Sequence, residues 1–404
     1  MRMPNERFDL LNLQEAMDIL GVSRATIDRW RKDKKLPHIK IGKEIWIDKN
    51  KLQAWVHLHA RAQEQEGTVK ISSSSRVITV GYQSGAALLW STLVIKRLGL
   101  FEEELRGIAP SADYKVKWVN APNGMELVEE LIGGNLHIAS IGDYPIMASR
   151  ALSHVLPRFK PLFLAFDGKT RNGGGISLVV PTGSVIHRPE DLNGAAISTV
   201  GNSSASYRLQ DWSSTFGLES APVVHRTMGD CLNGIIEGDV AASVLWEPYL
   251  SWVQSIGAGV PVLSEGVGGD YLTGLLADGN WVQGNEEVVI AYLKAHLRAH
   301  EFIRNQPDRA AAVVSEASGF PVAIVAGVLS QIRWDASLYQ RDLQTLNRLS
   351  EQQSGQLPAA AKPERQGDGF AFGKQYLQTA VEELKLPILP DTPLQGDWSR
   401  DMIY

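Results

Sequence analysis

The stretch Val119–Ser149, VNAPNGMELVEELIGGNLHIASIGDYPIMAS, carries the alternation of strand and helix that decides the fold. Residues 114–121 predict a strand, residues 124–134 a helix, and residues 136–145 a second strand with its turn. Such alternation is typical of open α/β sheets, in which ligands bind where loops leave the carboxyl ends of strands. The stretch therefore predicts an α/β fold with candidate ligand-binding loops.

The same pattern continues on both sides of this stretch. Helical segments such as residues 86–101 and 205–217 separate short apolar runs that read as strands. These further strands are expected at residues 77–83, 176–181, 195–201, 221–227, 241–248 and 260–266. We expect mostly parallel sheets whose carboxyl-end loops are GYQSGAA, NAPNGME, SIGDYP, VGNSSAS and LWEPY.

Charge divides the chain into a basic head and an acidic body. Residues 1–62 carry 13 Lys and Arg against 8 Asp and Glu, a net charge of +5, whereas the remainder carries −10. The basic head suggests an acidic partner such as DNA, although small surface domains often carry a few excess charges.

The order of elements in the head predicts a helix-turn-helix. One face of the first helix collects four apolar residues, Leu13, Ala16, Met17 and Leu20. Gly21 permits a tight turn, and Ser23 can cap a second, basic helix. Residues 38–47 alternate apolar and polar side chains, which predicts a small hairpin before a closing helix from Asp48.

Residues 11–56, with LGVSRATI, a basic helix and LPHIKIG in order, resemble the excisionase or MerR-like winged helix-turn-helix family. The resemblance implies base contacts from Arg24, Thr26 and Arg29, and phosphate contacts from Arg31, Lys32 and Lys43. The alternatives are an unrelated small helical domain, or a relative that binds a protein instead of DNA. One such module binds DNA weakly, so we expect a homo-oligomer.

Residues 77–350 resemble the type II periplasmic solute-binding fold, in the branch serving importers of aliphatic sulfonates, taurine and nitrate. The segments that carry the resemblance are VGYQSG, the opening stretch, PEDLNGAAISTVGNSSASYRL and IIEGDVAASVLWEPYLS. The chain differs from the family pattern at Asn202, Ala205 and Glu247. The resemblance implies two α/β lobes that close on a ligand.

The expected domain organisation follows from these assignments. Residues 1–62 form the helix-turn-helix domain, and the Ser-rich residues 63–75 form a flexible linker. Residues 76–353 form the binding domain, and residues 354–404 form an extension whose helix packs on the first lobe. Within the binding domain, lobe I takes residues 77–170 and 270–350, and lobe II takes residues 175–265.

The ligand is expected to be a small, anionic organic solute such as a sulfonate. Ser203 and Ser204 precede a predicted helix, whose free N–H groups and dipole favour an anion. The predicted ligand-binding residues are Gln83, Ser84, Asn123, Gly124, Asp143, Asn202, Ser203, Ser204, Trp246 and Glu247.

Several of these residues have a structural alternative. Asp143 could instead cap a helix, and Trp246 could equally belong to the core, where we place Trp90. Lys169 and Arg171 could hold an anion, but a solvated basic loop is favoured.

The sequence contains none of the common catalytic, Walker or zinc motifs, and its nine histidines are scattered. We therefore predict no enzyme activity, cofactor or metal. One cysteine and an N-terminus without a secretory pattern favour the cytoplasm. The leading hypothesis is a ligand-sensing DNA-binding regulator. The alternatives are a solute-binding component of an importer with a permease partner, and an enzyme related to thiamin-precursor synthases.

Overall fold

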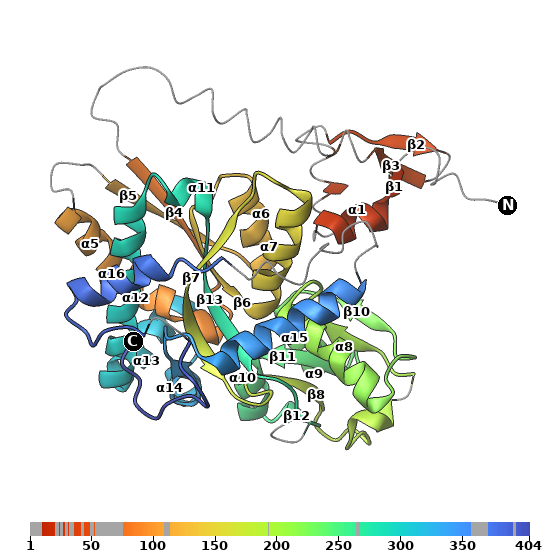
Figure 1. Ribbon diagram of the computed structural model, residues 1–404. Coiled ribbons are helices and arrows are strands. Elements are labelled where there is room, and N and C mark those ends of the chain that lie inside the picture. Colours follow the sequence, from red (N-terminus) through yellow and green to blue (C-terminus); the bar gives the residue numbers. More distant parts are fainter. Residues whose placement is uncertain are drawn as a thin grey trace.

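The computed structural model describes a two-lobed α/β body and parts of the N-terminal head (Figure 1). The described residues are 10–20, 24, 27–28, 31, 36–41, 44–48, 52, 76–108, 114–192, 194–263, 267–356, 371–390 and 393–404. The predicted linker, residues 63–75, lies outside them.

The head contains a helix and a three-stranded antiparallel sheet in the order β1-β3-β2. Its elements are β1 (Leu10–Asn12), α1 (Leu13–Leu20), β2 (Ile39–Ile41) and β3 (Glu44–Asp48). Asn12 Oδ1 accepts the N–H of Glu15, and Glu15 Oε2 accepts the N–H of Asn12, so a reciprocal cap starts α1. Ala16, Ile27 and Ile47 are buried together, and β2 and β3 form the predicted hairpin.

The larger lobe is built on a six-stranded sheet in the order β14-β7-β13-β6-β4-β5. Its strands are β4 (Arg76–Tyr82), β5 (Tyr114–Asn120), β6 (Ile138–Gly142), β7 (Pro161–Thr170), β13 (Tyr271–Asp278) and β14 (Arg333–Trp334). The early helices are η3 (Ala87–Leu89), α4 (Ser91–Leu98), α5 (Leu100–Ile108), α6 (Gly124–Ile132) and α7 (Asp143–Val155). Trp90 is fully buried, which confirms its place in the core.

The smaller lobe is built on a five-stranded sheet in the order β10-β9-β11-β8-β12. Its strands are β8 (Ile176–Pro181), β9 (Ile197–Thr199), β10 (Val223–His225), β11 (Ala242–Trp246) and β12 (Gly259–Pro261). Its helices are η4 (Pro189–Leu192), α8 (Ser204–Phe216), α9 (Met228–Glu237) and α10 (Tyr249–Ser255). The chain enters this lobe after β7 and leaves it before β13.

The expectation of mostly parallel strands is wrong for the described body. β4 lies parallel to β5 and β6, and β9 lies parallel to β10 and β11. The other five strand pairs are antiparallel. The physical reason is the crossing between lobes: β7 carries the chain out of the larger lobe and β13 carries it back.

The rest of the chain returns to the larger lobe. Its helices are α11 (Gly279–Val282), α12 (Glu286–Asn305), α13 (Pro307–Ser318), α14 (Val322–Gln331), α15 (Gln340–Gln356) and α16 (Lys374–Glu383). α16 packs against α12 and β7. Among the described helices, none alone is long and apolar enough to cross a bilayer; α13 and α14 meet the length and composition criteria only together, with a bend of 120°.

Candidate functional site

The predicted DNA-contacting residues are only partly described. Arg24 is exposed. Arg31 donates from Nη1 to Asp28 Oδ1 at 2.7 Å, so part of its charge is already neutralised within the head. Four others lie outside the described residues: Thr26, Arg29, Lys32 and Lys43.

The two lobes meet at a buried polar cluster. Asp143, the first residue of α7, accepts a hydrogen bond from Ser204 Oγ at 2.6 Å. Asp143 also pairs with Arg208 of α8, with 2.9 Å between Oδ2 and Nη2. We call Asp143, Ser204 and Arg208 the interlobe cluster. It joins the helix N-terminus after β6 in one lobe to the helix N-terminus after β9 in the other.

Two glycines permit this close approach of the lobes. A Cβ on Gly142 would lie 2.8 Å from Ser204 Oγ, which is too short for an ordinary contact. A Cβ on Gly85 would lie 2.9 Å from the Tyr249 hydroxyl. The carbonyl of Gly85 also accepts a hydrogen bond from Trp246 Nε1 of the smaller lobe at 2.8 Å. Glycine at both positions thus leaves room for side chains of the smaller lobe to approach the backbone of the larger lobe.

Arg208 is the cation of the interlobe cluster. Its guanidinium also donates to the carbonyls of Ser204 and Asp270 and lies over the Tyr271 ring at 4.7 Å. Its Nε is buried without a hydrogen-bond partner. A buried arginine that retains an unused N–H can donate a hydrogen bond to one more anionic or strongly accepting group.

The side chains of three predicted ligand residues enter the interlobe contact: Asp143, Ser204 and Trp246. Gln83 and Ser203 lie close to it in sequence and are also buried. Gln83 Nε2 donates to the Ser140 carbonyl at 3.3 Å, and Ser203 caps α8. Both side chains are therefore occupied within their own lobes.

The other predicted ligand residues have local roles. Ser84 and Asn120 exchange hydrogen bonds, and Asn123 caps α6. Gly124 packs tightly enough that a Cβ would lie 2.6 Å from Pro145. Asn202 is an exposed turn residue with φ of 50°.

Glu247 turns its side chain into its own lobe. Its carboxylate accepts both the N–H and the Oγ of Ser251, at 3.0 and 2.8 Å, at the start of α10. Burial raises the pKa of this carboxyl group, and the two hydrogen bonds offset part of that effect. Only its backbone reaches the other lobe, where its carbonyl accepts the N–H of Ala87 at 2.9 Å.

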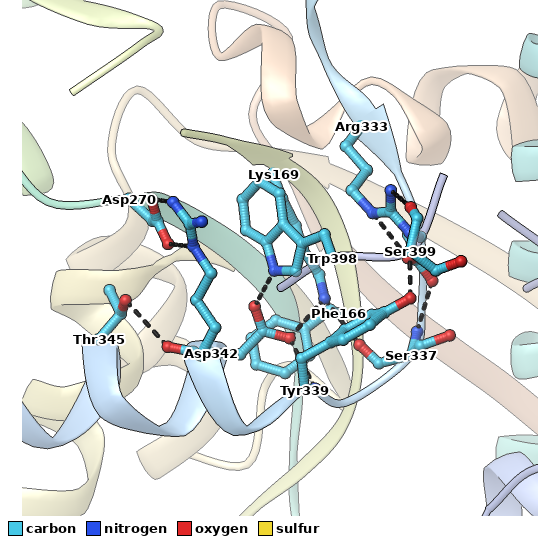
Figure 2. A network of polar contacts seen from close by, with 12 residues as sticks. Phe166, Lys169, Asp270, Arg333, Ser337, Tyr339, Asp342, Thr345, Trp398 and Ser399 are labelled. Atoms are coloured by element: carbon cyan, nitrogen blue, oxygen red, sulfur yellow. Dashed lines mark hydrogen bonds and ion pairs between the residues drawn. The ribbon is translucent and has the colours of Figure 1, made fainter. Parts of the chain in front are cut away.

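The expectation that Lys169 lies in a solvated basic loop is wrong. Lys169 lies at the end of β7 and is fully buried, with Nζ donating to Asp342 Oδ2 and the Ser337 carbonyl, both at 2.7 Å (Figure 2). Phe166 and Trp398 lie beside the ammonium. The desolvated charge is stable here because it has a carboxylate, a carbonyl and aromatic rings as neighbours.

The C-terminal tail completes this region. Arg171, just after β7, pairs with Asp397 at 2.9 Å, and Asp397 also binds Arg341 of α15 at 2.7 Å. Arg341 in turn binds Asp270, just before β13. The tail thus ties together both segments that connect the lobes.

The sequence did not predict Arg208 or the tail contacts, for different reasons. Arg208 follows Ser204 by one helical turn, so i,i+4 spacing could have placed both on one face. No local pattern points from Trp398 or Asp342 to Lys169, because these residues are far apart in the chain.

The lone cysteine has no exposed thiol. Cys231 on α9 is fully buried, and burial raises the pKa of its thiol to about 11. The thiol is therefore protonated at neutral pH, unlike a cysteine nucleophile.

The head and the body are each similar to known proteins. A model of the helix-turn-helix domain family matches residues 10–57, which confirms the prediction for the head. Over 268 residues the chain is 24% identical to the "Putative aliphatic sulfonates-binding protein" of Escherichia coli (strain K12), covering 65% of this chain and 77% of that protein.

Solved structures share the fold of the body. The alkanesulfonate-binding protein SsuA from Xanthomonas axonopodis pv. citri, bound to MOPS, has a TM-score of 0.59 and 19% identity, covering 71% of this chain and 96% of SsuA. The periplasmic nitrate-binding protein NrtA from Synechocystis PCC 6803 has a TM-score of 0.60 and 12% identity, covering 80% and 93%. The chain therefore joins an N-terminal helix-turn-helix domain to a domain of the type II periplasmic-binding-protein fold, and this second domain is similar to sulfonate-binding proteins.

Proposed function

We propose that this protein is a cytoplasmic, ligand-sensing transcriptional regulator that binds a small anionic organic solute, such as a sulfonate, between its two lobes. The observation that carries the proposal is the presence of a helix-turn-helix domain and a sulfonate-binding-protein-like domain in one chain. In this arrangement residues 1–62 bind DNA, residues 76–353 bind the solute, and the protein acts as a homo-oligomer.

The interlobe cluster supports an anionic ligand. Arg208 is buried with a free Nε donor, and it lies one turn from the N-terminus of α8, where the helix dipole favours negative charge. An anion arriving there would compete with Asp143 for the guanidinium. Ligand binding would thus replace a direct contact between the lobes by a contact through the ligand.

This exchange would allow the ligand to change the preferred arrangement of the two lobes. Asp143 belongs to one lobe and Arg208 to the other, so the preferred lobe arrangement depends on which anion the arginine holds. A ligand shifts DNA binding only by the difference between its affinities for the two arrangements. In a homo-oligomer, a change in lobe arrangement would alter the spacing of the two DNA-binding heads.

The test is a DNA-binding titration at fixed salt with sulfonates as probes. Fragments of the host genome captured by the full-length protein supply the DNA, and MOPS, taurine and octanesulfonate supply a series of sulfonates. We expect at least one sulfonate to change DNA affinity by about 5-fold or more, the lower range of ordinary allosteric coupling. Equal DNA affinity with and without every sulfonate that binds would refute the sensor role.

Two variants connect the effect to the interlobe cluster. Arg208→Met removes the buried cation, whereas Arg158→Met removes an exposed arginine before β7 and is the matched control. We expect Arg208→Met to weaken sulfonate binding by about 10-fold or more, because a charge-assisted hydrogen bond contributes about 1.5–3 kcal/mol. Unchanged sulfonate affinity in Arg208→Met would place the ligand elsewhere.

The importer hypothesis predicts a different outcome of the same titration. Its support is the likeness to importer-type binding proteins. A solute-binding component would bind a sulfonate but no genomic fragment, and a membrane permease would be retained by the ligand-loaded protein. Consumption of the sulfonate, followed by mass spectrometry, would instead favour an enzyme.

A further inference from the structure

A second buried polar cluster lies inside the larger lobe, away from the interlobe cluster. Asp167 is on β7, whereas His296 and His300 are four residues apart on α12. All three side chains are fully buried. Ser91, the first residue of α4, is buried beside them. One carboxylate, two imidazoles and one hydroxyl thus meet from three different elements, β7, α12 and α4.

The distances within this cluster suit a small metal ion. One ligand atom from each of Asp167, His296 and His300 lies within 4.8 Å of the other two. His300 Nε2 lies 3.0 Å from Asp167 Oδ1, and Ser91 Oγ lies 3.4 Å from His296 Nδ1. A tetrahedral ion with bonds of about 2.0–2.1 Å separates its ligand atoms by about 3.3–3.4 Å. The shorter of these separations are therefore already close to those around a bound ion, and the longer ones would have to shorten.

The tautomer of His296 is also that of a metal ligand. Its Nε2 lies 2.8 Å from the Phe166 carbonyl, which can only accept a hydrogen bond. The proton is therefore on Nε2, and Nδ1 presents its lone pair to the cluster. A backbone carbonyl that accepts the other ring N–H and so fixes the tautomer is usual for metal-bound histidine.

Asp167 lacks the Arg or Lys partner that the other buried aspartates of the described chain have. Four buried aspartates of the described chain pair with Arg or Lys: Asp143, Asp270, Asp335 and Asp342. Asp167 instead has the hydroxyls of Ser91 and Ser140 and the imidazole of His300 as its side-chain partners. A divalent cation would supply the missing positive charge.

We propose that Asp167, His296 and His300 form a structural site for a divalent transition metal of the Zn²⁺ class. His296 Nδ1, His300 Nε2 and an Asp167 oxygen are three ligands, and Ser91 Oγ stands at the fourth position. The site is closed to solvent, so the ion binds as the chain folds. It ties α4 and α12 to β7, the strand that leads out of the larger lobe.

The experiment refolds the full-length chain from denaturant with one equivalent of Zn²⁺ or with EDTA. Zinc content is measured by elemental mass spectrometry after gel filtration, and thermal unfolding is measured on both samples. We expect about one zinc ion per chain and a higher unfolding midpoint with zinc. Equal midpoints, or no retained zinc, in the wild-type protein would overturn the proposal without any variant.

Matched variants locate the zinc. His296→Gln and His300→Gln each keep a donor near the former Nε2 position but remove an imidazole ligand, whereas His154→Gln changes an exposed histidine on α7. We expect zinc affinity to fall by at least about 100-fold in the first two, beyond the effect of an outer-shell change, and not in the third. Zinc bound equally by all three would assign the metal to another place.

Discussion

Replacement of Lys169 by methionine should destabilise the larger lobe strongly. Lys169 Nζ and Asp342 Oδ2 are 2.7 Å apart, and both side chains are fully buried. Methionine preserves most of the apolar stem beside Phe166 but removes the ammonium. Asp342 then keeps only neutral donors, the Trp398 indole at 2.8 Å and the Tyr339 N–H at 3.0 Å.

The expected loss follows from the charge left behind. At an effective dielectric constant of about 20, two charges at this separation interact by about 6 kcal/mol, which sets an upper limit. The two neutral donors that remain on Asp342 recover part of this energy. Removing one partner of a buried pair usually costs about 3–5 kcal/mol, and we expect Lys169→Met to fall in that range.

A double-mutant cycle distinguishes a lost ion pair from lost packing. In Lys169→Met/Asp342→Asn neither charge remains, so the double variant should be more stable than Lys169→Met alone, with a coupling energy of about 2 kcal/mol. The free energy of unfolding is measured by urea denaturation, with exposed Lys160→Met as the control. A loss below about 1 kcal/mol for Lys169→Met, or additive effects in the double variant, would refute the reasoning.

Three further outcomes are expected. Asp397→Ala, which removes exposed pairs to Arg171 and Arg341, should change the free energy of unfolding by less than about 1 kcal/mol, measured by urea denaturation. Burial raises the pKa of Glu247 in the folded protein above its ordinary value of 4.5. Between these two pKa values the folded protein binds more protons than the unfolded chain. The contribution of Glu247 to stability should therefore increase as the pH falls towards 4.5. A Glu247→Gln variant with the same pH dependence as wild type would contradict this. The Cys231 thiol should react with a thiol reagent only at the rate of unfolding; fast reaction of the native protein would show that it is accessible.

The sequence predicted most elements because their signals are local. Gly21 and the helical periodicity before it marked the head, and the alternation of apolar runs marked most strands of the body. β7 was not predicted, because it ends in Lys169 and Thr170 beside a glycine-rich segment that is typical of a loop.

The sequence predicted where the candidate site lies but not which side chains pair within it. Asp143, Ser204 and Trp246 were identified from loops at strand ends, and these residues do meet between the lobes. The pairing of Asp143 with Arg208, and of Trp246 with Gly85, could not be identified, because these residues become neighbours only where the two lobes meet. A polar residue in a strand-end loop has the same sequence pattern whether it contacts a ligand or another side chain. The pattern therefore cannot distinguish the two.

The sequence by itself determined the class of fold, the helix-turn-helix head and the positions of the strand-end loops, because hydrophobic periodicity, turn residues and short motifs act over one or two helical turns. Only the tertiary structure decided that Lys169 is buried against Asp342 and Trp398, and that Asp167 meets His296 and His300. Those pairings join residues more than 50 positions apart, and burial of a charge becomes favourable only where distant parts of the chain supply its partners.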